Sequence, residues 1–317
     1  MAPFDLITTG RVGVDLYPQQ SNVGLADVKT FAKYLGGSAT NVAVQAARLG
    51  SRSAVVTKVG DDPFGPFVRG ALEDFGVDPR WVGTDPELRT PIVFCEVHPP
   101  DNFPLLFYRE PKAPDMNLTP GDFDVGAVRE ATVFWTTGTG LSDEPSRSTM
   151  LAMLEERSVA GPGRITIHDL DHRPMFWAHG SEATRWAREA LRHATVTVGN
   201  QDEVAVAVGT REPDEAAEAL LDLGVEIAIV KRGPDGVLAR TRDERVELPP
   251  VRLEVVNGLG AGDAFGGTLA HGLAHGWELE RTMRAANAAG AIAASRLACA
   301  DDFPTLGEIE EVLSAHV

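Results

Sequence analysis

Cysteine, tyrosine and long apolar stretches are scarce in this chain. Its 317 residues include two cysteines and three tyrosines. Cys95 and Cys299 alone cannot build a disulfide framework, so we expect the protein to work in the reducing cytoplasm. No stretch approaches the roughly 18 to 20 apolar residues of a membrane span, and residues 1–10 lack a basic segment followed by an apolar one. The sequence therefore predicts neither secretion nor membrane insertion.

Positive charge is also in short supply. Lysine and arginine number 29 against 46 acidic residues, which gives a formal net charge of -17. Such a surface repels phosphate backbones, so we do not expect a nucleic-acid partner. The hydrophobic content of 43% is that of a folded globular protein. Any anionic ligand must then be held by a few locally placed positive or amide groups.

Short apolar runs alternate with amphipathic segments along the chain, which is typical of βαβ units and predicts a parallel sheet covered by helices. The expected strands are 54–59, 132–137, 165–169, 195–198, 227–230 and 253–256. The expected helices are 39–49, 64–75, 145–154, 182–191, 216–223, 263–275 and 279–296.

Two stretches interrupt this alternation, at approximately residues 11–35 and 89–114. Strand-like pieces such as Pro91–Val97 and Leu105–Tyr108 occur there without intervening helices. We interpret both stretches as a small antiparallel accessory sheet. Ligands of open α/β folds bind at the carboxyl edge of the sheet, where such strands would emerge, so a lid is expected.

The most informative segment is a glycine-rich turn that follows a β-branched run. It reads Asn257-Gly258-Leu259-Gly260-Ala261-Gly262-Asp263 and opens a helix of small residues. Glycines allow close backbone approach, and the unpaired amides and dipole of a helix start favour an anion. Asp263 is either a simple N-cap or a base that accepts a proton from a hydroxyl attacking a phosphoryl group. The glycine spacing fits no dinucleotide fingerprint, and the absence of a Gly-Lys pair excludes a P-loop.

A second glycine pair precedes the helix expected at 39–49. It reads Gly36-Gly37-Ser38-Ala39-Thr40-Asn41. Asn41 offers both a donor and an acceptor to hydroxyl groups, and the glycines would let the preceding lid segment move. By itself this segment favours a turn with a helix cap.

Together these two segments resemble the signatures of the ribokinase-like (PfkB) carbohydrate kinases. The likeness extends along the chain, because Asn200-Gln201-Asp202-Glu203 resembles the N-x-x-E element of the family and residues 231–236 its K-x-G-x-x-G loop. The resemblance implies one three-layer α/β/α domain over residues 1–317, with a mainly parallel sheet and a β lid. It also implies ATP and Mg²⁺ as cofactors and phosphoryl transfer to a sugar hydroxyl.

The resemblance further implies roles for individual residues. Asp263 would be the base, and the amides of Gly260, Ala261 and Gly262 would stabilise the transferring phosphoryl group. Mg²⁺ would be organised by Asn200 and Glu203 through water and phosphate. The expected nucleotide neighbours are Asn200, Lys231, Gly233, Gly236 and Asn287. Asn257-Gly258 departs from the Asp-Thr of many members, a difference that affects the preceding turn and leaves the anion site intact.

The acceptor sugar is predicted from two arginines. Residues 169–177 resemble the D-x-N-x-R-P-x-x-W stretch of keto-deoxy sugar-acid kinases, with Asp171 in place of Asn, and Tyr108-Arg109 resembles their Y-R pair. A guanidinium can bind a carboxylate through two parallel hydrogen bonds. We therefore expect Arg109 and Arg173 to hold a carboxylate, and Asp15, Gly37 and Asn41 to bind the rest of the substrate.

Within the family the pattern is most similar to kinases of 5-dehydro-2-deoxy-D-gluconate, an intermediate of inositol catabolism. The alternatives are a 2-keto-3-deoxygluconate kinase, another sugar kinase of the fructokinase or ribokinase type, or a non-catalytic sugar or nucleotide sensor. A homodimer formed through the lid is a further expectation from the resemblance.

Overall fold

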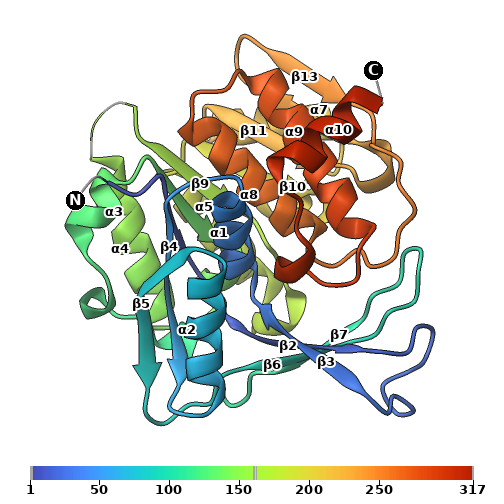
Figure 1. The fold of residues 1–317 in the computed structure, drawn as a ribbon. Coiled ribbons are helices and arrows are strands. Elements are labelled where there is room, and N and C mark those ends of the chain that lie inside the picture. The colour runs from blue at the N-terminus through green and yellow to red at the C-terminus, as the bar shows by residue number, and fades with distance from the viewer. Residues whose placement is uncertain (1–2, 160, 162, 316–317) are drawn as a thin grey trace.

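The computed structural model describes residues 3–159, 161 and 163–315 (Figure 1). Its centre is a nine-stranded sheet in the order β13-β12-β11-β10-β9-β8-β1-β4-β5, parallel from β11 to β5. The strands are β1 (Leu6–Thr9), β4 (Ser53–Gly60), β5 (Val77–Asp85), β8 (Val133–Thr137), β9 (Ile165–Asp169), β10 (Val196–Asn200), β11 (Ile227–Lys231), β12 (Val237–Arg240) and β13 (Arg245–Leu248).

Helices cover both faces of this sheet, which explains why strands such as β8 are apolar on both sides. Trp135 belongs to the apolar cluster shared with α1, α8 and α9, and its neighbour Phe134 to the cluster shared with α3, α4 and α5. The helices are α1 (Ser38–Arg48), α2 (Phe64–Asp74), α3 (Val125–Glu130), α4 (Ser146–Ser158), α5 (Gly180–Leu191), α6 (Gln201–Val208), α7 (Pro213–Asp222), α8 (Ala261–Ala274), α9 (Leu279–Ala294) and α10 (Leu306–Ala315). The predicted three-layer α/β/α arrangement is confirmed.

A separate four-stranded sheet projects from one end of the molecule (Figure 1). It consists of β3 (Phe31–Gly36), β2 (Gly13–Pro18), β6 (Ile92–Cys95) and β7 (Leu105–Tyr108), in that order. The pairs β2–β3 and β6–β7 are antiparallel, as expected, whereas β2 and β6 run parallel. This direction follows because β2 and β6 continue from β1 and β5, which leave the same edge of the parallel sheet.

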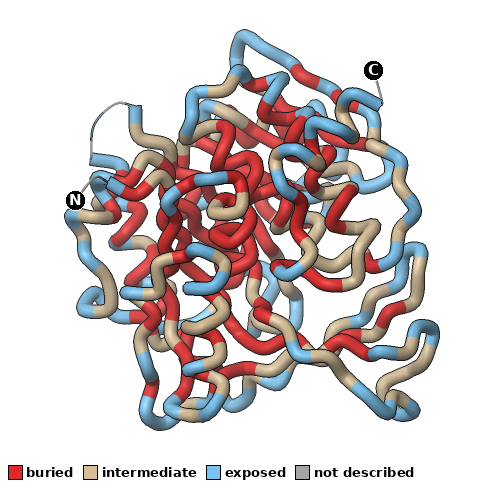
Figure 2. The backbone as a smooth tube through the Cα atoms, in the orientation of Figure 1, coloured by how far each residue is buried: buried red, intermediate tan, exposed pale blue. Residues whose placement is uncertain are grey.

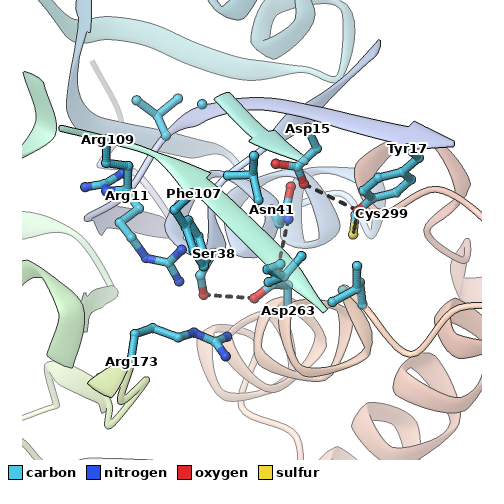
Figure 3. A pocket seen from close by; sticks show the side chains of 17 residues that line it. Arg11, Asp15, Tyr17, Ser38, Asn41, Phe107, Arg109, Arg173, Asp263 and Cys299 are labelled. Atoms are coloured by element: carbon cyan, nitrogen blue, oxygen red, sulfur yellow. Dashed lines mark hydrogen bonds between the residues drawn. The ribbon is translucent and has the colours of Figure 1, made fainter. Parts of the chain in front are cut away.

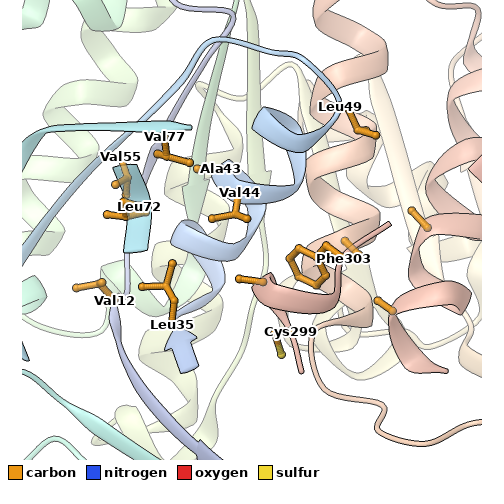
Figure 4. Packing of buried hydrophobic residues seen from close by; sticks show 14 of the residues in the cluster. Val12, Leu35, Ala43, Val44, Leu49, Val55, Leu72, Val77, Cys299 and Phe303 are labelled. Carbon is orange, nitrogen blue, oxygen red and sulfur yellow. The ribbon is translucent and has the colours of Figure 1, made fainter. Parts of the chain in front are cut away.

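The buried core lies in the large sheet and its helices, while the outlying loops of the small sheet are exposed (Figure 2). One apolar cluster nevertheless reaches the base of the small sheet. It joins Val12 and Leu35 to Val44 of α1, Leu72 of α2 and Phe303 (Figure 4). The base of the small sheet is therefore packed against the same core as the helices.

One predicted strand is absent and one unpredicted hairpin is present at the edge of the large sheet. The predicted strand 253–256 is irregular, because the amides of Val256 and Asn257 bond the carbonyl of Ala294 at the end of α9 instead of a strand. The edge position is taken by the hairpin β12–β13, which was not predicted. The β-branched pattern of residues 251–256 thus reflects packing on a helix.

Candidate active site

One cavity lies where the small sheet meets the carboxyl edge of the large sheet. It encloses about 580 Å³ of empty space, part of which is open to solvent. Seven of the predicted site residues line it, namely Asp15, Gly37, Asn41, Arg109, Arg173, Gly260 and Asp263. Segments far apart in sequence therefore converge at one place (Figure 3).

The start of α8 forms one wall of the cavity. Gly260 is the N-cap at φ 80°, a left-handed conformation that favours glycine. A Cβ atom on Gly260 would lie 2.5 Å from Sγ of Cys299, so a side chain does not fit either. No side chain caps this helix, and Asp263 lies inside its first turn. The N-cap alternative for Asp263 is therefore wrong, and the first amides of α8 remain available to an anion.

Asp263 is held by two donors from the first turns of α1. Ser38 Oγ donates to Asp263 Oδ1 and Asn41 Nδ2 donates to Asp263 Oδ2, each at 2.8 Å (Figure 3). Burial raises the pKa of Asp263, and the hydrogen bonds from Asn41 and Ser38 oppose that rise. Each carboxylate oxygen keeps a further acceptor site. The carboxylate is thus fixed in orientation and can still accept a proton.

Asp15 lies on β2 across the cavity, with 9% of its surface exposed. Tyr17 donates from its hydroxyl to Asp15 at 3.3 Å, and that hydroxyl also lies 2.7 Å from Cys299 Sγ. Burial, followed by the negative charge of Asp263, raises the pKa of Asp15 to about 7. A Cβ on Gly36 would come within 2.0 Å of the Asp15 carboxylate, which explains the need for glycine there.

A buried ion cluster connects the end of β1 with the segment after β9. Arg11 donates through Nη2 to both carboxylate oxygens of Asp171, at 2.9 and 3.2 Å, and through Nε to Thr139 Oγ1 at 3.0 Å. Arg173 Nε lies 3.3 Å from the same carboxylate. Burial would raise the pKa of Asp171, but Arg11 and Arg173 hold it well below its usual range.

Arg11 was not among the predicted site residues. Its signal in the sequence is a lone arginine between two glycines directly after a strand, at the edge where ligands bind.

Arg109, the other predicted carboxylate ligand, is engaged with a different partner. It follows β7, and its two terminal nitrogens donate to Asp115 at 2.7 and 3.2 Å. Asp115 is fully buried and also accepts from the backbone amide of Val12 at 3.2 Å. Arg109 thus borders the cavity as one half of an ion pair.

The predicted nucleotide residues lie outside the cavity lining. Lys231 ends β11 and points toward the start of α8, since its Nζ would be 3.4 Å from a Cβ placed on Gly262. Gly233 and Gly236 take positive φ angles of 56° and 90°, and Asn287 donates to the carbonyl of Pro249 at 2.8 Å. Lys231 therefore lies beside the glycine-rich turn at the start of α8. The nucleotide roles of all four residues stay predictions.

Asn200 and Glu203 form a reciprocal capping box at the start of α6. Asn200 Oδ1 accepts from the amides of Asp202 and Glu203, and Glu203 Oε2 accepts from the amide of Asn200. Within the described part of the chain, no group of three His, Cys, Asp or Glu side chains is arranged to hold a metal ion. The role of Asn200 and Glu203 in organising Mg²⁺ stays a prediction.

The family model for pfkB family carbohydrate kinases matches residues 4–306. The chain belongs to this family. The 5-dehydro-2-deoxygluconokinase of Photobacterium profundum is 34% identical over 96% of this chain and 92% of its own length. That of Geobacillus kaustophilus is 31% identical over 99% and 95%.

Solved structures of kinases share the fold of this pfkB member over nearly the whole chain. Fructokinase from Vibrio cholerae O395, bound to fructose, ADP and a calcium ion, superposes with a TM-score of 0.85 at 26% identity, covering 98% of this chain and 99% of its own. Aminoimidazole riboside kinase from Salmonella enterica, complexed with aminoimidazole riboside and an ATP analogue, gives 0.81 at 28%, with coverages of 98% and 99%. The protein is accordingly an ATP-dependent carbohydrate kinase with a ribokinase-like fold.

Among the described residues of this pfkB kinase, no helix is long and apolar enough to span a membrane.

Proposed function

We propose that this kinase phosphorylates a hydroxyl group of a sugar acid, 5-dehydro-2-deoxy-D-gluconate, in inositol catabolism. The supporting observation is the charge of the cavity: three arginines, Arg11, Arg109 and Arg173, line the space that also contains Asp263, in a chain whose net charge is -17. Asp115 and Asp171 pair with these guanidinium groups, and a substrate carboxylate could bind beside them as a further charged partner, which a neutral sugar could not. The two relatives named for this reaction are similar over nearly the whole chain.

In this proposal Asp263 is the general base. One of its oxygens accepts the proton of the acceptor hydroxyl, whose oxygen forms a bond to the γ-phosphorus of ATP while the bond to the ADP oxygen breaks. Ser38 and Asn41 keep the carboxylate aimed at that hydroxyl. The amides of Gly260, Ala261 and Gly262 stabilise charge on the transferring group.

Substrate hydroxyls are assigned to Asp15, with Asn41 and the backbone at Gly37 beside it, and the carboxylate to Arg109 and Arg173. All five line the cavity. On the nucleotide side, Lys231, Asn200, Gly233, Gly236 and Asn287 would border ATP.

Glu203 fits an outer-sphere role toward Mg²⁺, because its Oε2 is used by the capping box and Oε1 has no hydrogen bond among the described residues. When bound, Mg²⁺ supplies neutralisation of phosphate charge.

The small sheet is assigned the role of a lid over the cavity, and its outer strands that of a dimer contact. Leu106 and Tyr108 of β7 are 47% and 61% exposed, which supports a partner surface. Sedimentation measurements would test the dimer, and a monomer at micromolar concentration would count against it. The free, buried Cys95 and Cys299 suit the expected cytoplasmic location.

A substrate panel tests the proposed function. ADP release is measured with 5-dehydro-2-deoxy-D-gluconate, 2-keto-3-deoxygluconate, fructose and ribose at several concentrations. We expect the highest kcat/KM with the first acid, and a value at least about tenfold above those for fructose and ribose, since a charged group left unpaired in a binding site costs at least about 1.4 kcal/mol. Higher kcat/KM with fructose or ribose would refute the sugar-acid assignment.

A further inference from the structure

The three arginines of the cavity differ in how their charges are balanced. Arg109 faces its own carboxylate, Asp115, through two hydrogen bonds, so that pair is neutral. Arg11 and Arg173 instead share the single carboxylate of Asp171. The Arg11–Asp171–Arg173 cluster by itself therefore carries one net positive charge, and it shares the cavity with the carboxylates of Asp15 and Asp263.

Arg11 is the rigid member of this cluster. Its Nε and Nη2 are occupied by Thr139 and Asp171, while its Nη1 makes no hydrogen bond with any described residue. Arg11 is only 7% exposed and lines the cavity, whereas the Arg173 side chain is 40% exposed. In Figure 3 the guanidinium groups of Arg11 and Arg173 extend toward the Ser38–Asp263 pair, and that of Arg109 lies away from it.

The surroundings of Arg11 explain why it is fixed. Phe176 lies beneath its guanidinium, with the ring centre 5.9 Å from Cζ. Asp171 keeps a φ of 24°, a strained value for an aspartate, and accepts from both Arg11 and Thr139. An asparagine at position 171 would accept a hydrogen bond without carrying the charge that anchors two arginines. The negative charge at Asp171 therefore orients one edge of Arg11 and leaves the other edge free.

We propose that Arg11 is a substrate-binding residue that donates from Nη1 to the carboxylate of the acid, with Asp171 and Thr139 as positioning residues. This inference rests on the proposed sugar-acid function and adds to it a specificity determinant outside the two predicted arginines. A donor that is already oriented loses little freedom when the acid binds. Arg11 thus sets the preference for the acid over an uncharged sugar.

The test compares an acid with its uncharged counterpart in the full-length protein. Kinetics are measured for the parent, Arg11→Gln and Arg11→Lys with 5-dehydro-2-deoxy-D-gluconate and with its C1 amide. We expect Arg11→Gln to lower kcat/KM for the acid by about 10- to 100-fold, mainly through KM, because a charge-assisted hydrogen bond is lost. The kcat/KM of Arg11→Gln for the C1 amide should change by less than about threefold. Arg11→Lys, which keeps the charge without the planar fork, should lose about tenfold on the acid.

Arg69→Gln is the matched control. Arg69 lies on α2, donates to the carbonyls of Val82 and Gly83, and does not line the cavity. Its replacement also removes a partly buried guanidinium, so it reports general destabilisation. The ratio of acid to amide kcat/KM should stay at the parent value in this variant.

The outcomes separate this inference from the proposed function. If the parent shows no preference for the acid over the amide, the sugar-acid function fails and the role of Arg11 fails with it. If the parent prefers the acid and both Arg11 variants keep that ratio, the Arg11 assignment alone is overturned. Equal losses on acid and amide would also overturn it, because they indicate a purely structural role. Should Arg11→Gln not fold, the ratio in Arg11→Lys decides.

Discussion

Replacing Asp15 by asparagine should make the protein more stable at neutral and alkaline pH. Asp15 is buried, its one hydrogen-bond donor is Tyr17 among the described residues, and its pKa is raised from 3.8 to about 7. The folded state therefore binds the proton more tightly than the unfolded state does. The stability that Asp15 contributes is present below about pH 4 and is lost as the pH rises through about 7.

The size of the effect follows from that rise in pKa. At about 1.4 kcal/mol per pH unit, an ionised Asp15 lowers the free energy of unfolding by about 4 kcal/mol above about pH 7. Asparagine has nearly the same shape and does not titrate. Between about pH 5 and pH 8 the stability of Asp15→Asn relative to the parent should therefore increase by about 2 to 3 kcal/mol.

Urea unfolding at a series of pH values between about 5 and 8 measures this difference. Asp62→Asn serves as the control. Burial works to raise the pKa of Asp62, but hydrogen bonds from Thr90, Phe64 and Gly65 lower it. Asp62 is therefore ionised throughout this range, so its replacement should shift stability by an amount that does not vary with pH. Parallel stability curves for the parent and Asp15→Asn would refute the reasoning.

Three further changes test other parts of the site. Asp263→Asn should lower kcat by about 10²- to 10⁴-fold with ATP binding retained, as measured by turnover and calorimetry, and near-parental turnover would contradict its role as base. Gly260→Ala should lower the free energy of unfolding by about 1 to 3 kcal/mol, because φ is 80° and the new Cβ would meet Cys299. Gly70→Ala, where a Cβ has open space, is its control in thermal melts. Lys231→Met should raise the KM for ATP about tenfold or more, and an unchanged KM would exclude Lys231 from the nucleotide site.

Local features of the site could be predicted from the sequence because they depend on neighbouring residues. The turn before α8 needs glycine at position 260 for a positive φ, and the helix that follows places Asp263 in its first turn. A glycine-rich run followed by such a helix can be recognised from a short stretch of sequence alone. The alternation of apolar runs predicted the parallel sheet for the same reason.

Contacts between distant segments could not be predicted in this way. The donors to Asp263 come from Ser38 and Asn41, which lie 225 and 222 positions away in the sequence. Arg11 and Asp171 are separated by 160 positions, so neither their pairing nor the free edge of Arg11 follows from the sequence. Asn41 was expected to bind substrate, and only the packing of α1 against α8 reveals that its amide also holds the base.

The edge of the large sheet illustrates a different limit of predicting structure from sequence. Residues 253–256 have the composition of a strand, yet a helix end satisfies the amide of Val256. β-Branched residues favour any half-buried surface, so composition alone did not distinguish a strand from a segment laid against α9.

Arg11 lies in the segment that connects the two sheets, so it also affects how the small sheet is attached. The chain leaves β1 at Thr9 and enters β2 at Gly13, so Arg11 belongs to the short strap from which the small sheet extends. Its side chain ties that strap to Thr139 and Asp171 on the large-sheet side. If the small sheet moves, its connection to β1 therefore stays fixed at Arg11. Under the proposed function, an acid bound at Arg11 would keep its position while the small sheet moves over it.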